Sequence, residues 1–139
     1  MRRALLLIPF LFAGCGGDPF KTAPVSGRIT VNGKPLAKAS VTFAPVAVGN
    51  NIEPGPSSAG KTDADGRYTL TLIGKNVSGA VVGKHKVMVA MLDEADTSSD
   101  LPDKTRQLPP QYNGQTTLRF DVPADGSDKA DFDLKIPVR

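Results

Sequence analysis

Two carboxylates one residue apart, Asp63 and Asp65, form the most evident group of potential metal ligands in the chain. Oxygen ligands at alternate positions are typical of calcium loops, but an EF-hand also requires a ligand at its fifth position and a glutamate at its twelfth. Counted from Asp63, these positions hold Arg67 and Gly74, so the EF-hand pattern is broken. The alternatives are a weak surface calcium contact and a structural turn, in which Asp63 binds backbone amides and Gly66 takes a positive φ. We expect the turn, and we predict no metal site.

The single histidine, His85, is the next candidate for chemistry. A histidine-based metal site needs further ligands that the chain does not offer. Nucleophilic catalysis is equally unsupported, because the chain has no Gly-x-Ser-x-Gly turn to expose a serine beside a base. His85 shares strand parity with Val87 and Val89, so we expect it to pack or to form a hydrogen bond at a strand end. We predict no catalytic residue, no cofactor and no enzymatic activity.

Cys15 is the only cysteine, so the chain cannot form an internal disulfide. It follows a positive pair (Arg2 and Arg3), an apolar run over residues 4–12 and the small residues Ala13 and Gly14. This order is that of a secretory signal with its cleavage site. The alternatives are ordinary cleavage near Gly14 and a short membrane anchor, and the run is far shorter than the roughly 20 residues that a spanning helix needs.

The pattern around Cys15 resembles the signal peptide of bacterial lipoproteins. The resemblance implies that residues 1–14 are removed, that acyl chains on Cys15 hold the protein to a membrane, and that residues 15–24 form a tether. Gly16 stands where some bacteria place the aspartate that retains a lipoprotein in the inner membrane. The resemblance therefore favours the outer membrane, with the domain facing the periplasm or the cell surface.

Charge and composition exclude some functions. The chain has 17 basic and 14 acidic residues, and removing Arg2 and Arg3 with the leader leaves 15 against 14. No basic cluster remains to follow a phosphate backbone, so we expect no nucleic-acid partner. The part after the leader has a length suited to one domain, and the 14 glycines, 12 prolines and absent tryptophan of the whole chain favour short strands and turns.

Alternation of apolar and polar residues predicts six clear strands and no helix beyond the leader. The inward sets are Val25, Gly27, Ile29 and Val31; Ala39, Val41 and Phe43; Tyr68, Leu70 and Leu72; Val87, Val89 and Met91; Leu118, Phe120 and Val122; and Phe132, Leu134 and Ile136. Asn32 and Gly33 predict a type I′ hairpin turn that joins the first strand to the second. Residues 47–61 read as a polar loop, and a seventh strand could be hidden in one of the loops. One-sided strands must bury their faces against a second sheet, so we expect an all-β, Greek-key sandwich of about seven strands (six to eight) over residues 25–139.

Two segments, residues 25–43 and 62–68, resemble the opening strands and the acidic turn of carboxypeptidase regulatory-like domains. These are small transthyretin-like (prealbumin-like) sandwiches. Residues 83–89 are similar to their next strand, which commonly has an aromatic residue at the position of His85, and residues 110–113 resemble small bacterial lipoproteins built from this domain alone. The resemblance implies a single prealbumin-like sandwich, and it says little about activity.

The Pro109–Asn113 segment is the strongest candidate for binding outside the core. Tyr112 either caps the core edge or forms, with Asn113, an exposed contact for a sugar or protein. The sequence thus predicts a lipid-anchored, non-catalytic module of the cell envelope that contacts a protein or glycan partner. The alternative is an accessory subunit of an outer-membrane transport or secretion system, because similar domains occur on larger outer-membrane receptors.

Overall fold

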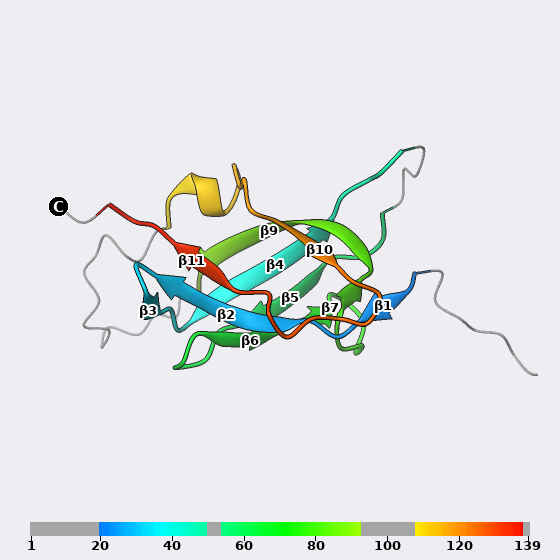
Figure 1. Ribbon diagram of the computed structural model, residues 1–139, viewed down its shortest axis with the longest axis horizontal. Helices are drawn as coiled ribbons and strands as arrows, with labels where there is room; N and C mark the ends of the chain where they lie inside the picture. Colours follow the sequence, from blue (N-terminus) through cyan, green and yellow to red (C-terminus); the bar gives the residue numbers. More distant parts are fainter. Residues whose placement is uncertain (1–19, 50–53, 93–107, 138–139) are drawn as a thin grey trace, which may run out of the picture.

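The computed structural model describes residues 20–49, 54–92 and 108–137, and this part of the chain is all-β apart from the 3₁₀ turn η2 (Pro110–Tyr112). The all-β prediction is confirmed. Figure 1 shows the strands, with the C-terminal end of the chain opposite the end at which β1 begins. The strands are β1 (Thr22–Ala23), β2 (Ser26–Val31), β3 (Lys34–Pro35), β4 (Ala39–Pro45), β5 (Ser58–Lys61), β6 (Arg67–Thr69), β7 (Thr71–Leu72), β8 (Ala80–Val81), β9 (Gly83–Met91), β10 (Arg119–Val122) and β11 (Phe132–Leu134).

Two sheets pack face to face in a sandwich-like arrangement. One has the order β10-β9-β4-β5-β7, with every neighbouring pair antiparallel. The other is built around β2, which pairs antiparallel with β3 and β6 and parallel with β11. Figure 1 shows β2, β6 and β11 crossing in front of β4, β5 and β9. A small third pair, β1 with β8, lies at the end where the described chain begins.

The core lies between the sheets and is made by the predicted inward parity. Val41, Phe43, Val87 and Val89 of the five-stranded sheet are fully buried, and so is Ile29 of β2. Residues of opposite parity, such as Arg28, Lys86 and Asp133, are exposed. This is the pattern expected when each sheet buries one face.

The partner of β2 differs from the prediction. Asn32 and Gly33 have φ values of 50° and 84°, as a two-residue I′ turn requires. However, the turn joins β2 to the short β3, in which Lys34 lies opposite Val31, while β4 belongs to the other sheet. The chain changes sheets at Lys38, whose φ is 57°, and the Lys38 amide donates to the Thr62 carbonyl at 3.3 Å. Alternation predicted that both segments are strands, but it did not predict their pairing.

The predicted strand around Leu70 is also divided between the two sheets. β6 pairs with β2, whereas β7 pairs with β5, and Leu70 is fully buried at the junction. The partner of β7 is the strand hidden in the loop predicted over residues 47–61. β5 has few apolar residues to signal its presence, and Ser58 and Gly60 occupy positions opposite Phe43 and Val41.

The tether predicted over residues 15–24 is too long at its C-terminal end. Thr22 and Ala23 form β1, opposite Val81 and Ala80, and Ala23 is buried. The physical reason is that Gly79 has no Cβ, so the backbone of Ala23 can approach it closely; a Cβ on Gly79 would collide with the Ala23 carbonyl. The rest of the predicted tether, with the predicted acylation site Cys15, lies outside the described residues, and so does the predicted leader over residues 1–14.

Candidate functional site

The acidic turn is held by its own backbone. Asp63 Oδ1 accepts hydrogen bonds from the amides of Asp65 at 2.9 Å and Arg67 at 3.0 Å, which is Asx-turn geometry. Gly66 has a φ of 76°, and a Cβ on it would collide with the Ile29 carbonyl. The Asp65 carbonyl accepts from Arg28 Nε at 2.9 Å, which ties the turn to β2. Within the described residues, no three His, Cys, Asp or Glu side chains gather closely enough to hold a metal ion.

A carboxylate from the C-terminal strand region holds the Asn32–Gly33 turn. Asp133 Oδ1 accepts from Thr30 Oγ1 at 2.8 Å and from the Gly33 amide at 3.0 Å. The hydrogen bond from Lys135, together with those from Gly33 and Thr30, lowers the pKa of Asp133 to about 2. Gly33 and Asp133 therefore act as parts of the architecture.

His85 lies in the core, as its strand parity predicted. Its side chain is fully buried, its ring lies 5.7 Å from that of Phe43, and its Nε2–H donates to the Val81 carbonyl at 2.6 Å. Nδ1 has no hydrogen-bond partner among the described residues. Burial lowers the pKa of His85, opposed in part by the backbones of Val81 and Phe43 and by the Asp121 carboxylate. The fold therefore holds the neutral ring.

Acidification is expected to destabilise the fold through His85. Because the folded-state pKa lies below the unfolded value near 6.5, the unfolded chain binds more protons between these two values. The stability contribution is full above about pH 6.5 and falls below it by at most about 1.4 kcal/mol per pH unit. Urea unfolding at pH 5–8 measures the slope of the free energy of unfolding against pH. The His85→Phe variant has no titratable group at this position, so its slope should be smaller. Equal slopes in the two proteins would refute the assignment.

Tyr112 caps the core edge instead of facing solvent. It is 8% exposed, its hydroxyl donates to the Lys135 carbonyl at 2.8 Å, and it accepts from the Lys135 amide at 2.8 Å. The side chain is therefore not the exposed contact of the second interpretation, because η2 turns it inward. Asn113 is half-buried, and its Oδ1 accepts from the Gly114 amide at 2.5 Å. The structure places the two residues together, but it does not form a binding surface around the tyrosine.

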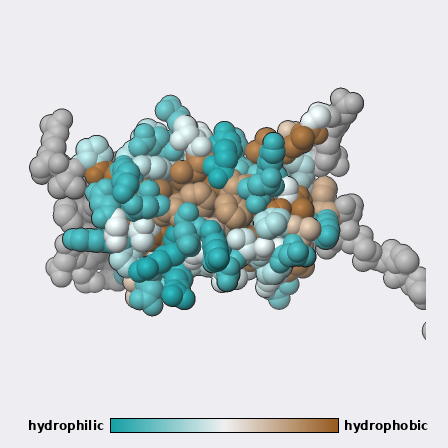
Figure 2. Space-filling model, viewed as in Figure 1, coloured by the Kyte–Doolittle hydropathy of each residue, from teal (hydrophilic) through white to brown (hydrophobic). Residues whose placement is uncertain are grey.

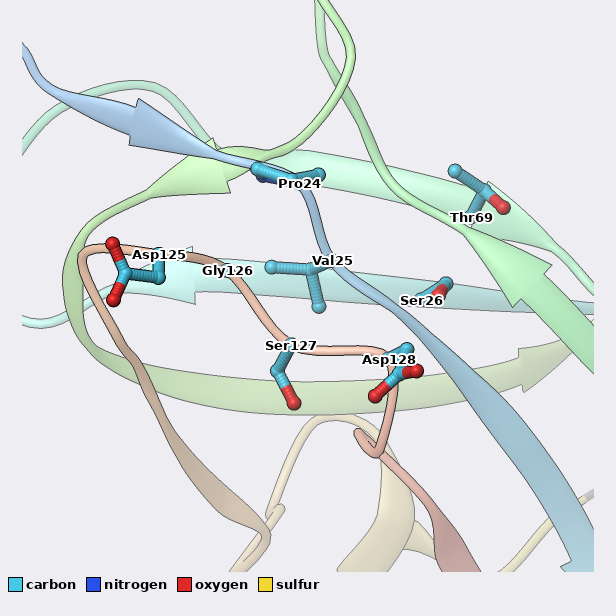
Figure 3. A pocket seen from close by; sticks show the side chains of 8 residues that line it. All are labelled: Pro24, Val25, Ser26, Thr69, Asp125, Gly126, Ser127 and Asp128. Carbon is cyan, nitrogen blue, oxygen red and sulfur yellow. The ribbon is translucent and has the colours of Figure 1, made fainter.

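An open hollow of about 370 Å³, with exposed carboxylates among its lining residues, lies instead beside the start of β2. It is lined by Pro24, Val25, Ser26, Thr69, Asp125, Gly126, Ser127 and Asp128. Figure 3 shows the turn between β10 and β11, with Asp125 and Asp128, running alongside the segment from Pro24 to Ser26, while Thr69 lies on the other side of that segment. Both carboxylates are exposed. Three separate parts of the chain therefore meet at this hollow.

Backbone hydrogen bonds fix the two sides of the hollow against each other. The Ser127 amide donates to the Pro24 carbonyl at 2.9 Å, and the Ser26 amide donates to the Ser127 carbonyl at 2.9 Å. Gly126 has a φ of 82°, and a Cβ on it would collide with Pro24. Ser127 Oγ accepts from the Lys129 amide at 3.1 Å, which shapes the C-terminal half of the turn. The carboxylates are thus displayed on a backbone that is already ordered.

The hollow can accept hydrogen bonds from several directions. Asp125 and Asp128 provide acceptor oxygens, while the hydroxyls of Ser26 and Thr69 both donate and accept. Such groups suit the hydroxyls of a glycan or the amides and cations of a protein surface. The sequence signal for this turn was Asp125 followed by Gly126, a turn dipeptide. The sequence could not show that Pro24 and Thr69 lie beside it.

A second hollow of about 430 Å³ lies where β9 and β10 meet the residue after β4, and Val46, Lys84, His85, Arg119, Phe120 and Asp121 line it. Lys84 and Asp121 are direct cross-strand neighbours in it. Opposite charges in this position stabilise a sheet modestly. We therefore treat this hollow as part of the sheet surface.

No protein-family model, curated protein or solved structure matches this chain. Among the described residues, no helix has the length and apolar character needed to cross a membrane.

Proposed function

We propose that this protein is a lipid-anchored, non-catalytic module of the bacterial cell envelope that contacts a protein or glycan partner. Cys15 would carry the acyl chains, and the outer membrane would be the site of attachment. The observation that supports the proposal is the open hollow beside the start of β2, where Asp125 and Asp128 are displayed on a turn that backbone hydrogen bonds fix to the segment from Pro24 to Ser26. His85 supports a non-catalytic role, because its ring is buried and bonded to Val81.

We further propose that the sandwich is a carboxypeptidase regulatory-like domain of the transthyretin-like type, with a Greek-key arrangement. The motifs that carry this resemblance have architectural roles in the fold. Gly33 and Gly66 take positive φ at tight turns, Asp63 forms an Asx-turn, and Gly27 permits a close approach by Ala130. These roles support a scaffold whose loops, rather than its motifs, determine what it binds.

The anchor is tested by Cys15→Ser in the full chain. We expect the unaltered protein to pellet with membranes and to carry acyl mass on its N-terminal peptide, and we expect the variant to move to soluble fractions. The physical reason is that one acyl chain binds a bilayer marginally, whereas several hold a protein stably. A Cys15→Ser variant that still pellets, or an unaltered protein with an unmodified Cys15 thiol, would contradict the anchor.

The binding role is tested by crosslinking in cells. A photoreactive amino acid at Asp128 should give a discrete covalent adduct with a partner, whose identity follows from mass spectrometry. The same group at Asn113, beside the buried Tyr112, is the matched control at the opposite end of the sandwich. Adducts at Asn113 and none at Asp128 would overturn the assignment of the hollow. In a second experiment the photoreactive amino acid stands at Thr69, and Asp125→Asn and Asp128→Asn are introduced together. If the two carboxylates bind the partner, this double substitution should reduce the yield of the adduct formed from position 69.

A further inference from the structure

Three large apolar side chains stand out on the surface of the described residues. Val46, Val48 and Ile73 are 38%, 59% and 55% exposed, respectively. Val46 and Val48 follow β4, and Ile73 follows β7. Figure 2 shows apolar surface at the right-hand end of the molecule, around the chain that leaves β4, which is the end where β1 begins in Figure 1.

Hydrogen bonds and contacts place these side chains close to the N-terminal segment. The Val46 amide donates to the carbonyl of Lys84 at 2.9 Å. Lys84 lies near the start of β9, which follows β8 in the chain, and β8 pairs with β1. The Ile73 amide donates to the Ser57 carbonyl at 2.9 Å, which joins the turn after β7 to the returning arm of the β4–β5 loop. All three side chains therefore belong to segments that meet at one end of the sandwich.

Phe20, the first described residue, also lies at this end of the sandwich. A Cβ on Gly55, in the β4–β5 loop, would lie only 3.0 Å from the ring of Phe20, so the loop packs against the segment that leads into β1. Cys15 precedes Thr22 by seven residues. A fully extended chain covers at most about 3.6 Å per residue, so an acylated Cys15 cannot lie more than about 25 Å from the start of β1. A membrane that holds Cys15 is therefore kept within reach of the end of the sandwich that carries Val46, Val48 and Ile73.

We propose that this end of the sandwich rests on the lipid surface, with Val46, Val48 and Ile73 inserted among the lipid head groups and upper acyl chains. The inference rests on the proposed acylation of Cys15. Three side chains bury too little apolar area to hold a soluble domain on a bilayer, but the anchor makes their contact intramolecular and raises its effective concentration. Lys21 and Lys84 are exposed at the same end, as are Asp125 and Asp128, so the apolar side chains and not net charge provide the contact.

Tryptophan fluorescence tests this docking, since the chain has no tryptophan of its own. Val48→Trp and Ile73→Trp place the probe in the patch, and Gln115→Trp, at an exposed position after η2, is the control at the opposite end. The full-length precursor of each variant is expressed, and the mature protein is purified from membranes and reconstituted into phosphatidylcholine–phosphatidylglycerol vesicles with or without brominated acyl chains. We expect a shift to shorter wavelength and loss of emission in brominated vesicles at positions 48 and 73, but not at 115.

Each other outcome has a distinct meaning. An acylated protein in which positions 48 and 73 behave like position 115 would overturn the docking while leaving the anchor intact. A shift of emission to shorter wavelength without loss of emission in brominated vesicles would mean that protein, such as a second copy of the chain, covers the patch. This result would also overturn the docking. Absence of acyl mass on Cys15 would overturn the anchor, and this inference with it.

Discussion

Phe43→Ala is expected to lower the free energy of unfolding by about 3–5 kcal/mol, the usual cost of truncating a buried phenylalanine. Phe43 is fully buried in β4. Its ring contacts aromatic rings from both sheets, with centroid distances of 6.4 Å to Tyr68, 5.7 Å to His85, 5.6 Å to Phe120 and 6.3 Å to Phe132. Removing it leaves a cavity that these rings cannot fill without leaving their own contacts.

The position of Phe43 makes the effect large for this fold. Phe120 and Phe132 lie on β10 and β11, which end their respective sheets and are not paired with each other. Figure 2 shows apolar surface between these strands at the centre of the molecule. The two half-buried rings meet edge to face at 6.2 Å, and both pack against Phe43. Phe43 thus supports the side of the sandwich that lacks backbone pairing.

Urea unfolding measures this prediction. Phe43→Leu, which keeps most of the apolar volume, should cost less than Phe43→Ala and provides a measurable protein if the alanine variant does not fold. Val48→Ala is the control, because Val48 is 59% exposed and its truncation should change stability by no more than about 0.5 kcal/mol. A Phe43→Ala variant as stable as Val48→Ala would contradict the central role of this ring.

Side-chain parity was the part of the fold that the sequence predicted well. Every large residue placed inward in β2, β4 and β9 is buried or half-buried, because strict alternation leaves only one face that can enter a core. Pairing was predicted poorly. β2 and β4 are joined by a short connection, yet they belong to different sheets, since the change of sheet depends on the backbone conformation of Lys38 and on its hydrogen bond to Thr62.

The candidate site shows the same limit. Local chemistry predicted the Asx-turn at Asp63, whose partners are two and four residues away. The hollow at Asp125 depends on Pro24 and Thr69, which are far apart in sequence and meet only through the tertiary fold. Tyr112 was an ambiguous residue for the same reason, because its hydrogen-bond partner is the backbone of Lys135. A contact with a distant backbone atom leaves no pattern in a single sequence.

The second large effect is expected from Gly27→Ala, which should cost about 2–6 kcal/mol, the sum of a steric and a hydrogen-bond contribution. Gly27 lies in β2, opposite Tyr68 of β6, and a Cβ on it would collide with the backbone carbonyl of Ala130. Forcing extra atoms into a packed core costs about 1–3 kcal/mol. The same carbonyl accepts a 2.5 Å hydrogen bond from the buried Tyr68 hydroxyl. Displacing Ala130 would leave that hydroxyl without its partner, at a further cost of about 1–3 kcal/mol.

The Tyr68 hydroxyl makes this mechanism testable beyond stability alone. Burial, with a smaller contribution from Asp131, raises the pKa of Tyr68 above its ordinary value, so the phenol stays protonated as a donor to Ala130. If Gly27→Ala acts by moving Ala130, then Tyr68→Phe should be destabilising alone but should cost little more when added to Gly27→Ala. Gly114→Ala is the matched control, since a Cβ there meets no atom within 4 Å. If the losses in the free energy of unfolding from Gly27→Ala and Tyr68→Phe are strictly additive, the collision and the hydrogen bond are independent. If Gly27→Ala leaves the urea midpoint of unfolding unchanged, the segment at Ala130 can move without a cost in stability.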